Sequence, residues 1–171
     1  MIKDLFPYKS ILIICSVNTA RSPMAEGYLS AFFSNMDLKI AVKSCGIASN
    51  ARDGMLISLD AKLAMKEDGI NLSETSKSRD LKKHPELLEN VDLVLTLTEK
   101  HKEVFLELFP DQKADLYTLK EFAGRNGDIK DPSMKGLSGF RVARDEIKDC
   151  LFKGLRKWQK NIKIDDLKKI N

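Results

Sequence analysis

Uninterrupted apolar runs alternate along the chain with segments whose apolar residues recur at helical spacing. Residues 11–14 form a continuous run of β-branched and apolar side chains, and a second strand is expected at 91–97, where residues 93–95 form a shorter run of this kind. Such runs are typical of parallel strands that are covered on both faces. Shorter strands are expected at 39–44, which Gly46 would end, and at 114–119. The alternation predicts a doubly wound α/β fold, with a mainly parallel four-stranded sheet and helices on both faces.

Four helices are expected between and after these strands, at 23–34, 58–68, 99–109 and 138–160. Pro23 suits a first turn, Gly69 a C-terminal stop, and Thr98 an N-cap. The last helix carries apolar residues three and four positions apart, which predicts a buried stripe. Its members are Phe140, Ala143, Ile147, Cys150, Leu151, Leu155 and Trp158.

Two polar residues look unremarkable in this pattern. His101 falls in an early helical turn, where a single histidine more often faces solvent or caps the helix than catalyses. Arg79 ends a polar loop and is expected to be a surface charge. Asp131 is a third polar residue of this kind. It belongs to the polar, glycine-bearing loop 123–139, where an Asp-Pro pair by itself usually marks a turn.

The composition fits one domain over residues 1–171, with a core at about 10–160, a short N-terminal extension and a basic, solvated C-terminal tail. Residues 1–9 lack the apolar stretch of a signal peptide, and no apolar run approaches the roughly 20 residues of a membrane span. The three cysteines have no close pair, which argues against a disulfide framework or a zinc site. The net charge of +4 is mixed along the chain, so nucleic-acid binding is not favoured. We expect a cytoplasmic protein, with a monomer favoured.

The segment that follows the first strand carries the clearest chemistry. Cys15 and Arg21 are separated by five residues in a loop that leads into a helix. The backbone amides of such a loop can converge with a helix N-terminus on one anion, and an arginine adds a fixed fork of donors. Ser22 is the hydroxyl donor to a nucleophilic thiolate, and Asn18 tolerates left-handed backbone angles. The loop therefore predicts a cradle for a phosphate-sized ligand.

The residues Cys15-Ser-Val-Asn-Thr-Ala-Arg-Ser-Pro-Met-Ala-Glu26 resemble the signature loop of the low molecular weight protein-tyrosine phosphatases. The similarity continues through the segments 44–46, 91–95, 117–122, 127–132 and 144–146, in the order of that family. The resemblance implies a phosphatase that acts on phosphorylated proteins through a phosphocysteine intermediate, with no metal or other cofactor.

The resemblance also assigns roles to residues. Cys15 is implied as the nucleophile, Arg21 as the phosphate ligand and Asp131 as the general acid. Asp128, in the same loop, is the runner-up for that role, although an ordinary loop carboxylate more often stays solvated. Phosphate binding falls to the whole loop, namely Ser16, Val17, Asn18, Thr19, Ala20, Arg21 and Ser22. Asn18, Ser22 and Ser44 are implied as supports of the loop.

Several positions depart from the family pattern. Val17 stands where glycine is usual, so its methyl groups could crowd the loop, and Ala20 replaces a second cysteine that could protect Cys15 by a disulfide. Ser133 and Met134 follow Asp131-Pro132, where tyrosine-specific members carry aromatic residues. Aromatic selectivity is therefore in question.

Four functions remain open from the sequence. The main interpretation is a phosphatase of the tyrosine type. A protein-arginine phosphatase is the near-equal alternative, because Thr19 is associated with phosphoarginine in that branch. An arsenate reductase would have to shuttle a disulfide through Cys45 and Cys150. An inactive phosphate-binding module would keep Arg21 but lose the attack geometry through Val17.

Overall fold

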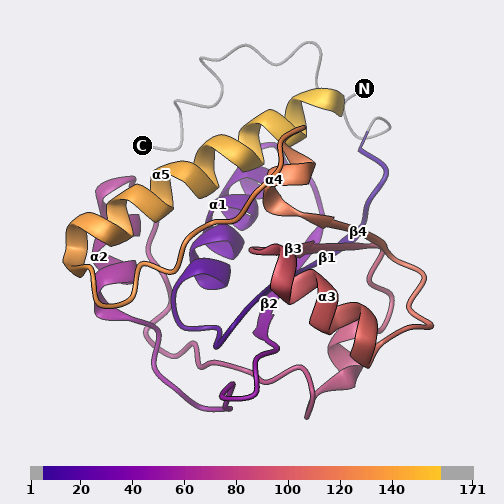
Figure 1. Ribbon diagram of the computed structural model, residues 1–171. Coiled ribbons are helices and arrows are strands. Elements are labelled where there is room, and N and C mark those ends of the chain that lie inside the picture. Colours follow the sequence, from indigo (N-terminus) through magenta and orange to yellow (C-terminus); the bar gives the residue numbers. More distant parts are fainter. Residues whose placement is uncertain (1–5, 159–171) are drawn as a thin grey trace.

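Four parallel strands form the centre of the molecule in a computed structural model that describes residues 6–158 (Figure 1). The strands are β1 (Ser10–Cys15), β2 (Ala41–Gly46), β3 (Leu93–Thr96) and β4 (Asp115–Thr118), in the order β2-β1-β3-β4. Each neighbouring pair is parallel, and the register sets Cys15 opposite Gly46. The carboxyl ends of the strands therefore meet at one edge of the sheet, which is where parallel α/β folds place their ligands.

Helices cover both faces of this sheet, as the sequence predicted. Figure 1 shows α1 (Arg21–Asn35), α2 (Leu59–Glu67) and α5 (Gly136–Leu155) on one side and α3 (Glu99–Leu108) on the other. Ile11 and Ile13 of β1 belong to the core beneath the first group, whereas Leu12 and Ile14 pack with Phe105 of α3 in the second core. The side chains of β1 thus alternate between two buried layers, which is why its sequence is continuously apolar.

The predicted stripe of the last helix is buried from Phe140 to Leu155. The helix itself begins at Gly136, two residues earlier than expected, and is followed by the short helix η3 (Arg156–Trp158). The α-helix ends at Leu155, so the predicted end at residue 160 was too late; the basic tail beyond residue 158 lies outside the described residues. Trp158 is half-buried and stacks on Phe122, with ring centroids 5.7 Å apart.

Other element boundaries differ from the predictions by one or two residues. β2 starts at Ala41 instead of residue 39, because the chain first turns out of α1 through Asp37, whose φ is 54°, and the Leu38 amide still bonds to the Phe33 carbonyl. α1 begins at Arg21, so this residue belongs to the first helical turn. Two short helices were missed, η2 (Pro85–Leu88) and α4 (Leu119–Phe122).

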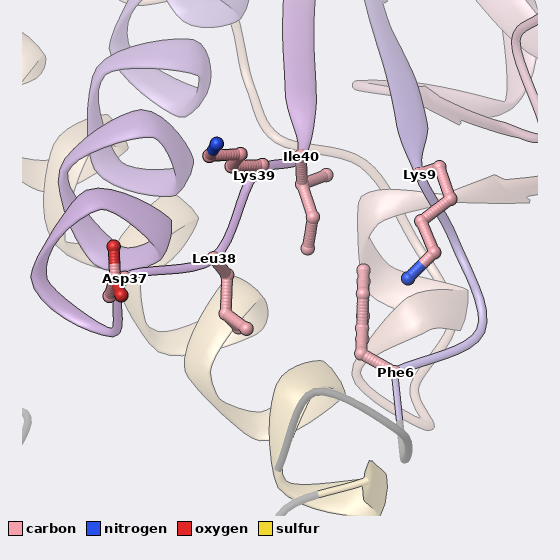
Figure 2. A pocket seen from close by; sticks show the side chains of 6 residues that line it. All are labelled: Phe6, Lys9, Asp37, Leu38, Lys39 and Ile40. Carbon is pink, nitrogen blue, oxygen red and sulfur yellow. The ribbon is translucent and has the colours of Figure 1, made fainter.

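A cavity of about 460 Å³ lies at the amino ends of β1 and β2, at the opposite edge of the sheet from Cys15. Figure 2 shows Phe6 and Lys9 on one side of it and Leu38 and Ile40 on the other. Its lining includes no candidate site residue. Within the described part of the chain, no helix is long and apolar enough to span a membrane.

Candidate active site

The loop between β1 and α1 folds around the sulfur of Cys15. This residue ends β1 and is 2% exposed. The Asn18 backbone N–H donates to Sγ over 3.2 Å, and the Ser22 hydroxyl oxygen lies 2.9 Å from Sγ. Asn18 adopts the left-handed φ of 62° that lets the loop double back, as its residue type predicted. Two hydrogen-bonding groups, the Asn18 amide and the Ser22 hydroxyl, are thereby directed at one sulfur.

A chain of hydrogen bonds holds Asn18 in place. Its Nδ2 donates to Ser22 Oγ and to Ser44 Oγ, each over 2.9 Å, and its Oδ1 accepts the Arg79 backbone N–H over 3.0 Å. The Ser44 hydroxyl donates a hydrogen bond to the Glu26 carboxyl group over 2.9 Å. The oxygens of Ser44 and Ser22 can therefore accept from Asn18, and the Ser22 proton can point to the sulfur of Cys15 at 2.9 Å or to the more distant Cys45 carbonyl at 3.5 Å.

Glu26 is the acidic end of this chain and was not recognised as a site residue from the sequence. Burial raises the pKa of its carboxyl, while the Ser44 hydrogen bond and the charge of Arg79 act in the opposite direction. The Glu26 side chain therefore accepts the Ser44 hydrogen bond inside the protein, where a buried carboxyl group needs hydrogen-bond partners.

Arg21 connects the loop to the acidic segment 128–131. Its guanidinium is 6% exposed, and Nη1 donates to the Ile129 carbonyl over 2.8 Å. Nη2 donates to Ser16 Oγ over 3.3 Å and lies 3.9 Å from the Asp131 carboxylate. The structure thus brings Asp131, which is distant in sequence, beside Arg21 of the loop that begins at Cys15.

The two candidate acids differ in their surroundings. The Asp131 side chain is 57% exposed and accepts the Ser133 N–H over 2.9 Å. Partial burial alone would raise the pKa of Asp131, but the Ser133 hydrogen bonds and the positive charge of Arg21 bring it below its usual value. Asp128 instead accepts the Glu99 N–H at the start of α3, over 2.8 Å. Its carboxylate therefore caps a helix.

Val17 fits the loop without backbone strain. Its φ lies outside the left-handed region, which in this loop is occupied by Asn18. The close approach is made by Gly46 on the neighbouring strand, because a Cβ at that position would lie 2.7 Å from the Ser16 carbonyl oxygen. The glycine that the chain needs is therefore on β2.

A cavity of about 860 Å³ opens beside Ser16, Arg21 and Asp131. Ile47, Val104 and Leu108 give it an apolar wall, and within residues 6–158 no Phe, Tyr or Trp lines it. Met134, which follows the Asp131-Pro132 pair, points fully into solvent. The cavity thus places an apolar, non-aromatic surface next to the phosphate cradle.

Comparison with known proteins agrees with this arrangement. A sequence model of the low molecular weight phosphotyrosine protein phosphatases matches residues 10–166. The chain belongs to this family. The resemblance and the fold class expected from the sequence are both confirmed.

Two curated members illustrate the two branches. The protein-arginine-phosphatase of Geobacillus stearothermophilus is 39% identical over 85% of this chain and 92% of its own length. The low molecular weight protein-tyrosine-phosphatase PtpB of Staphylococcus haemolyticus is 30% identical over 80% of this chain and 91% of its own length. A solved structure of the YwlE arginine phosphatase, a Cys-to-Ser mutant with a phosphorylated active-site serine, superposes with a TM-score of 0.77. It is 31% identical and covers 89% of this chain and 96% of that chain.

Two sequence expectations about this phosphatase were wrong. Arg79 is half-buried, and its guanidinium donates to the Ser44 carbonyl over 3.2 Å while its backbone N–H bonds to Asn18. His101 is 5% exposed, and its Nε2 lies 2.7 Å from Ser16 Oγ. Both errors have one cause, because segments distant in the sequence fold over these residues and replace the expected solvent.

Proposed function

We propose that this family member is a protein-arginine phosphatase that works through a covalent phosphocysteine on Cys15. The observation that carries the proposal is the cluster of Cys15, Arg21 and Asp131 at the carboxyl edge of the sheet. Thiolate, guanidinium and carboxyl are the nucleophile, the oxyanion ligand and the proton donor that a two-step phosphoryl transfer needs.

In the first step, Cys15 Sγ attacks phosphorus, so that a P–S bond forms while the bond to the leaving group breaks. Arg21 and the backbone amides of residues 16–22 hold the equatorial oxygens, which carry the charge of the transition state. Asp131 gives its proton to the leaving group. In the second step, Asp131 takes a proton from water, which attacks phosphorus and releases phosphate from the sulfur.

The surroundings of Asp131 suit both of its roles. In the free protein, Arg21 and Ser133 favour the carboxylate. A bound phosphoryl dianion would offset the charge of Arg21 and repel the Asp131 carboxylate, which raises its pKa toward that of a proton donor. The phosphorylated serine in the YwlE mutant supports a covalent intermediate at the corresponding nucleophile.

Phosphoarginine is favoured over phosphotyrosine by two features. Thr19 occupies the loop position at which the arginine phosphatase branch, which this chain resembles, carries threonine. Among residues 6–158, the cavity also has no aromatic side chain in its lining that would stack on a tyrosine ring. The 39% identity to an arginine phosphatase adds support. The tyrosine-type activity, which was the main interpretation of the sequence, becomes the competing outcome.

The test is phosphate release from matched phosphoarginine and phosphotyrosine peptides, with Cys15→Ser as the blank. Faster release from phosphoarginine, lost in Cys15→Ser and slowed by a factor of about 10² to 10⁴ in Asp131→Asn, is expected. Thr19→Ile should shift the preference toward phosphotyrosine. A wild-type preference for phosphotyrosine would overturn the substrate proposal, and normal turnover by either loss-of-function variant would overturn the mechanism.

Two further proposals concern the setting of the reaction. We propose that it needs no metal and takes place in the cytoplasm, which the family resemblance supports.

The arsenate reductase alternative finds no support, because Cys45 and Cys150 are buried and burial raises the pKa of both thiols. Bound phosphate without turnover would instead favour the inactive phosphate-binding module.

A further inference from the structure

His101 lies where α3 meets the phosphate cradle. It sits in the first turn of α3, and its backbone N–H is held by Thr98 Oγ1 over 3.1 Å. Its Nε2 is 2.7 Å from Ser16 Oγ, which also receives a hydrogen bond from Arg21 Nη2 over 3.3 Å. The imidazole is thus the outer member of a three-residue chain that ends on the arginine of the cradle.

The imidazole ring of His101 is neutral at pH 7 and therefore has a single N–H. Its pKa is lowered to about 4, mainly by burial and to a smaller extent by the positive charge of Arg21. The neutral ring has two tautomers, with the proton on Nδ1 or on Nε2. The geometry around the two ring nitrogens decides between them.

Nδ1 is buried and has no hydrogen-bond partner among residues 6–158. A proton there would be an unsatisfied buried donor, and orphaned N–H groups are rarer in proteins than orphaned acceptors. A proton on Nε2 instead meets the Ser16 oxygen at 2.7 Å. The Nε2–H tautomer is therefore favoured, with His101 as the donor and Ser16 as the acceptor.

This tautomer determines what Ser16 can do. A serine hydroxyl has two acceptor lone pairs and one proton. Arg21 and His101 occupy the two lone pairs, so the Ser16 proton has to point elsewhere. Ser16, Arg21 and His101 all line the same 860 Å³ cavity, which gives the proton a direction toward a bound oxyanion.

We propose that His101 is a positioning residue of the oxyanion cradle, one that fixes Ser16 by an Nε2–H donor so that the Ser16 hydroxyl and the Arg21 fork both face the phosphoryl oxygens. The proposal rests on the proposed function for its role in turnover. Its effect on oxyanion binding can be measured without any turnover.

The first test is binding of orthovanadate, followed by calorimetry, to variants that separate the two ring nitrogens. The amide nitrogen of His101→Gln reaches the place of Nε2, whereas that of His101→Asn reaches only the place of Nδ1. Loss of one net hydrogen bond should weaken vanadate binding about tenfold in His101→Asn and His101→Leu. His101→Gln should stay within about threefold of the wild type.

Glu103→Gln is the matched control, because Glu103 lies in the same helix, is exposed and pairs only with Lys100 among the described contacts. It should bind vanadate like the wild type. Equal weakening in His101→Gln and His101→Asn, or wild-type binding by His101→Asn, would overturn the proposal. In the peptide assay, kcat/KM should follow the same order. A protein inactive on every phosphopeptide that still shows this order in vanadate binding would refute only the proposed function.

The second test reads the tautomer directly. The chain has two histidines, so ¹⁵N nuclear magnetic resonance of the labelled protein can assign the ring nitrogens of His101 by comparison with His101→Gln. A neutral ring with its proton on Nε2 at pH 7 is expected, with and without vanadate. A proton on Nδ1 would contradict the proposal whatever the variants do.

Discussion

Replacing Gly46 with alanine tests whether the phosphate cradle depends on a contact from the neighbouring strand. An ideal Cβ at Gly46 would lie 2.7 Å from the Ser16 carbonyl oxygen and 3.0 Å from the Val17 Cα and carbonyl carbon. Gly46 cannot retreat, because its N–H bonds to the Arg79 carbonyl over 2.8 Å and its carbonyl accepts the Leu81 N–H over 2.9 Å. The loop that carries Ser16 has to move instead.

The size of the effect follows from these distances. Ordinary contact of a Cβ begins at 3.4 Å, so relieving the 2.7 Å contact requires a shift of about 0.7 Å, the difference of the two values. A misplacement of about 1 Å in a catalytic site can reduce the rate about 10²-fold. We expect kcat/KM of Gly46→Ala to fall by one to two orders of magnitude, in the range of about 10 to 10², with vanadate binding weakened in parallel.

Gly27→Ala is the matched control. Gly27 lies inside α1, and the atoms nearest to an added Cβ are the flexible ends of Leu72 and Met65, at 2.9 and 3.1 Å. Alanine also has the higher helix propensity, by about 1 kcal/mol. Its activity should remain at the wild-type level. If Gly46→Ala is folded and equally active, the strand contact does not position the loop and the reasoning fails.

Three further predictions concern the network and the scaffold. Burial raises the folded-state pKa of Glu26, so stability from this group is present at low pH and lost as pH rises. Glu26→Gln should therefore raise Tm more at pH 7.5 than at pH 4, as calorimetry would show; an equal change at both pH values would contradict the shift. Gly154→Ala should lower the free energy of unfolding, measured in urea, by about 1 to 3 kcal/mol despite the better helix propensity of alanine, because its Cβ would overlap the Phe122 ring. An unchanged urea midpoint would refute the overlap. Arg144→Lys should lower the free energy of unfolding by about 1 to 2 kcal/mol in the same assay. The buried guanidinium donates to the Ala64 carbonyl over 2.8 Å, and the lysine side chain cannot replace this bond. Unchanged stability would show that the bond is dispensable.

The sequence predicts the parts of this phosphatase that depend on local pattern. The continuous apolar run of β1 requires burial on both faces, and the following loop places its thiol and guanidinium by spacing alone. One missed element also had a local signal. Thr118 and Glu121 are three residues apart, and their reciprocal hydrogen bonds form the capping box that starts α4. Reading that box would have revealed the short helix.

The remaining site residues depend on contacts between distant segments. Arg79 contacts Asn18, which is 61 positions earlier in the chain, and His101 contacts Ser16, which is 85 positions earlier. The sequence around Arg79 and His101 contains no local motif that would predict these hydrogen-bond partners. Glu26 stood within the recognised loop motif, yet its role emerges only when β2 brings Ser44 beside it. Helical spacing predicts which residues share a helix, but not which strand or loop will cover them.

The saturated hydrogen bonding of Asn18 has a consequence for selectivity. Both of its amide protons and its carbonyl oxygen are already engaged before any ligand arrives. The entropy of ordering the loop is therefore lost during folding and not during binding, a form of preorganisation. A preorganised phosphate cradle of this kind should bind any tetrahedral oxyanion of suitable size and charge, whether free or attached to a protein. Discrimination among phosphorylated side chains then depends on the residues that surround the cradle, which can change during evolution without disturbing the fold.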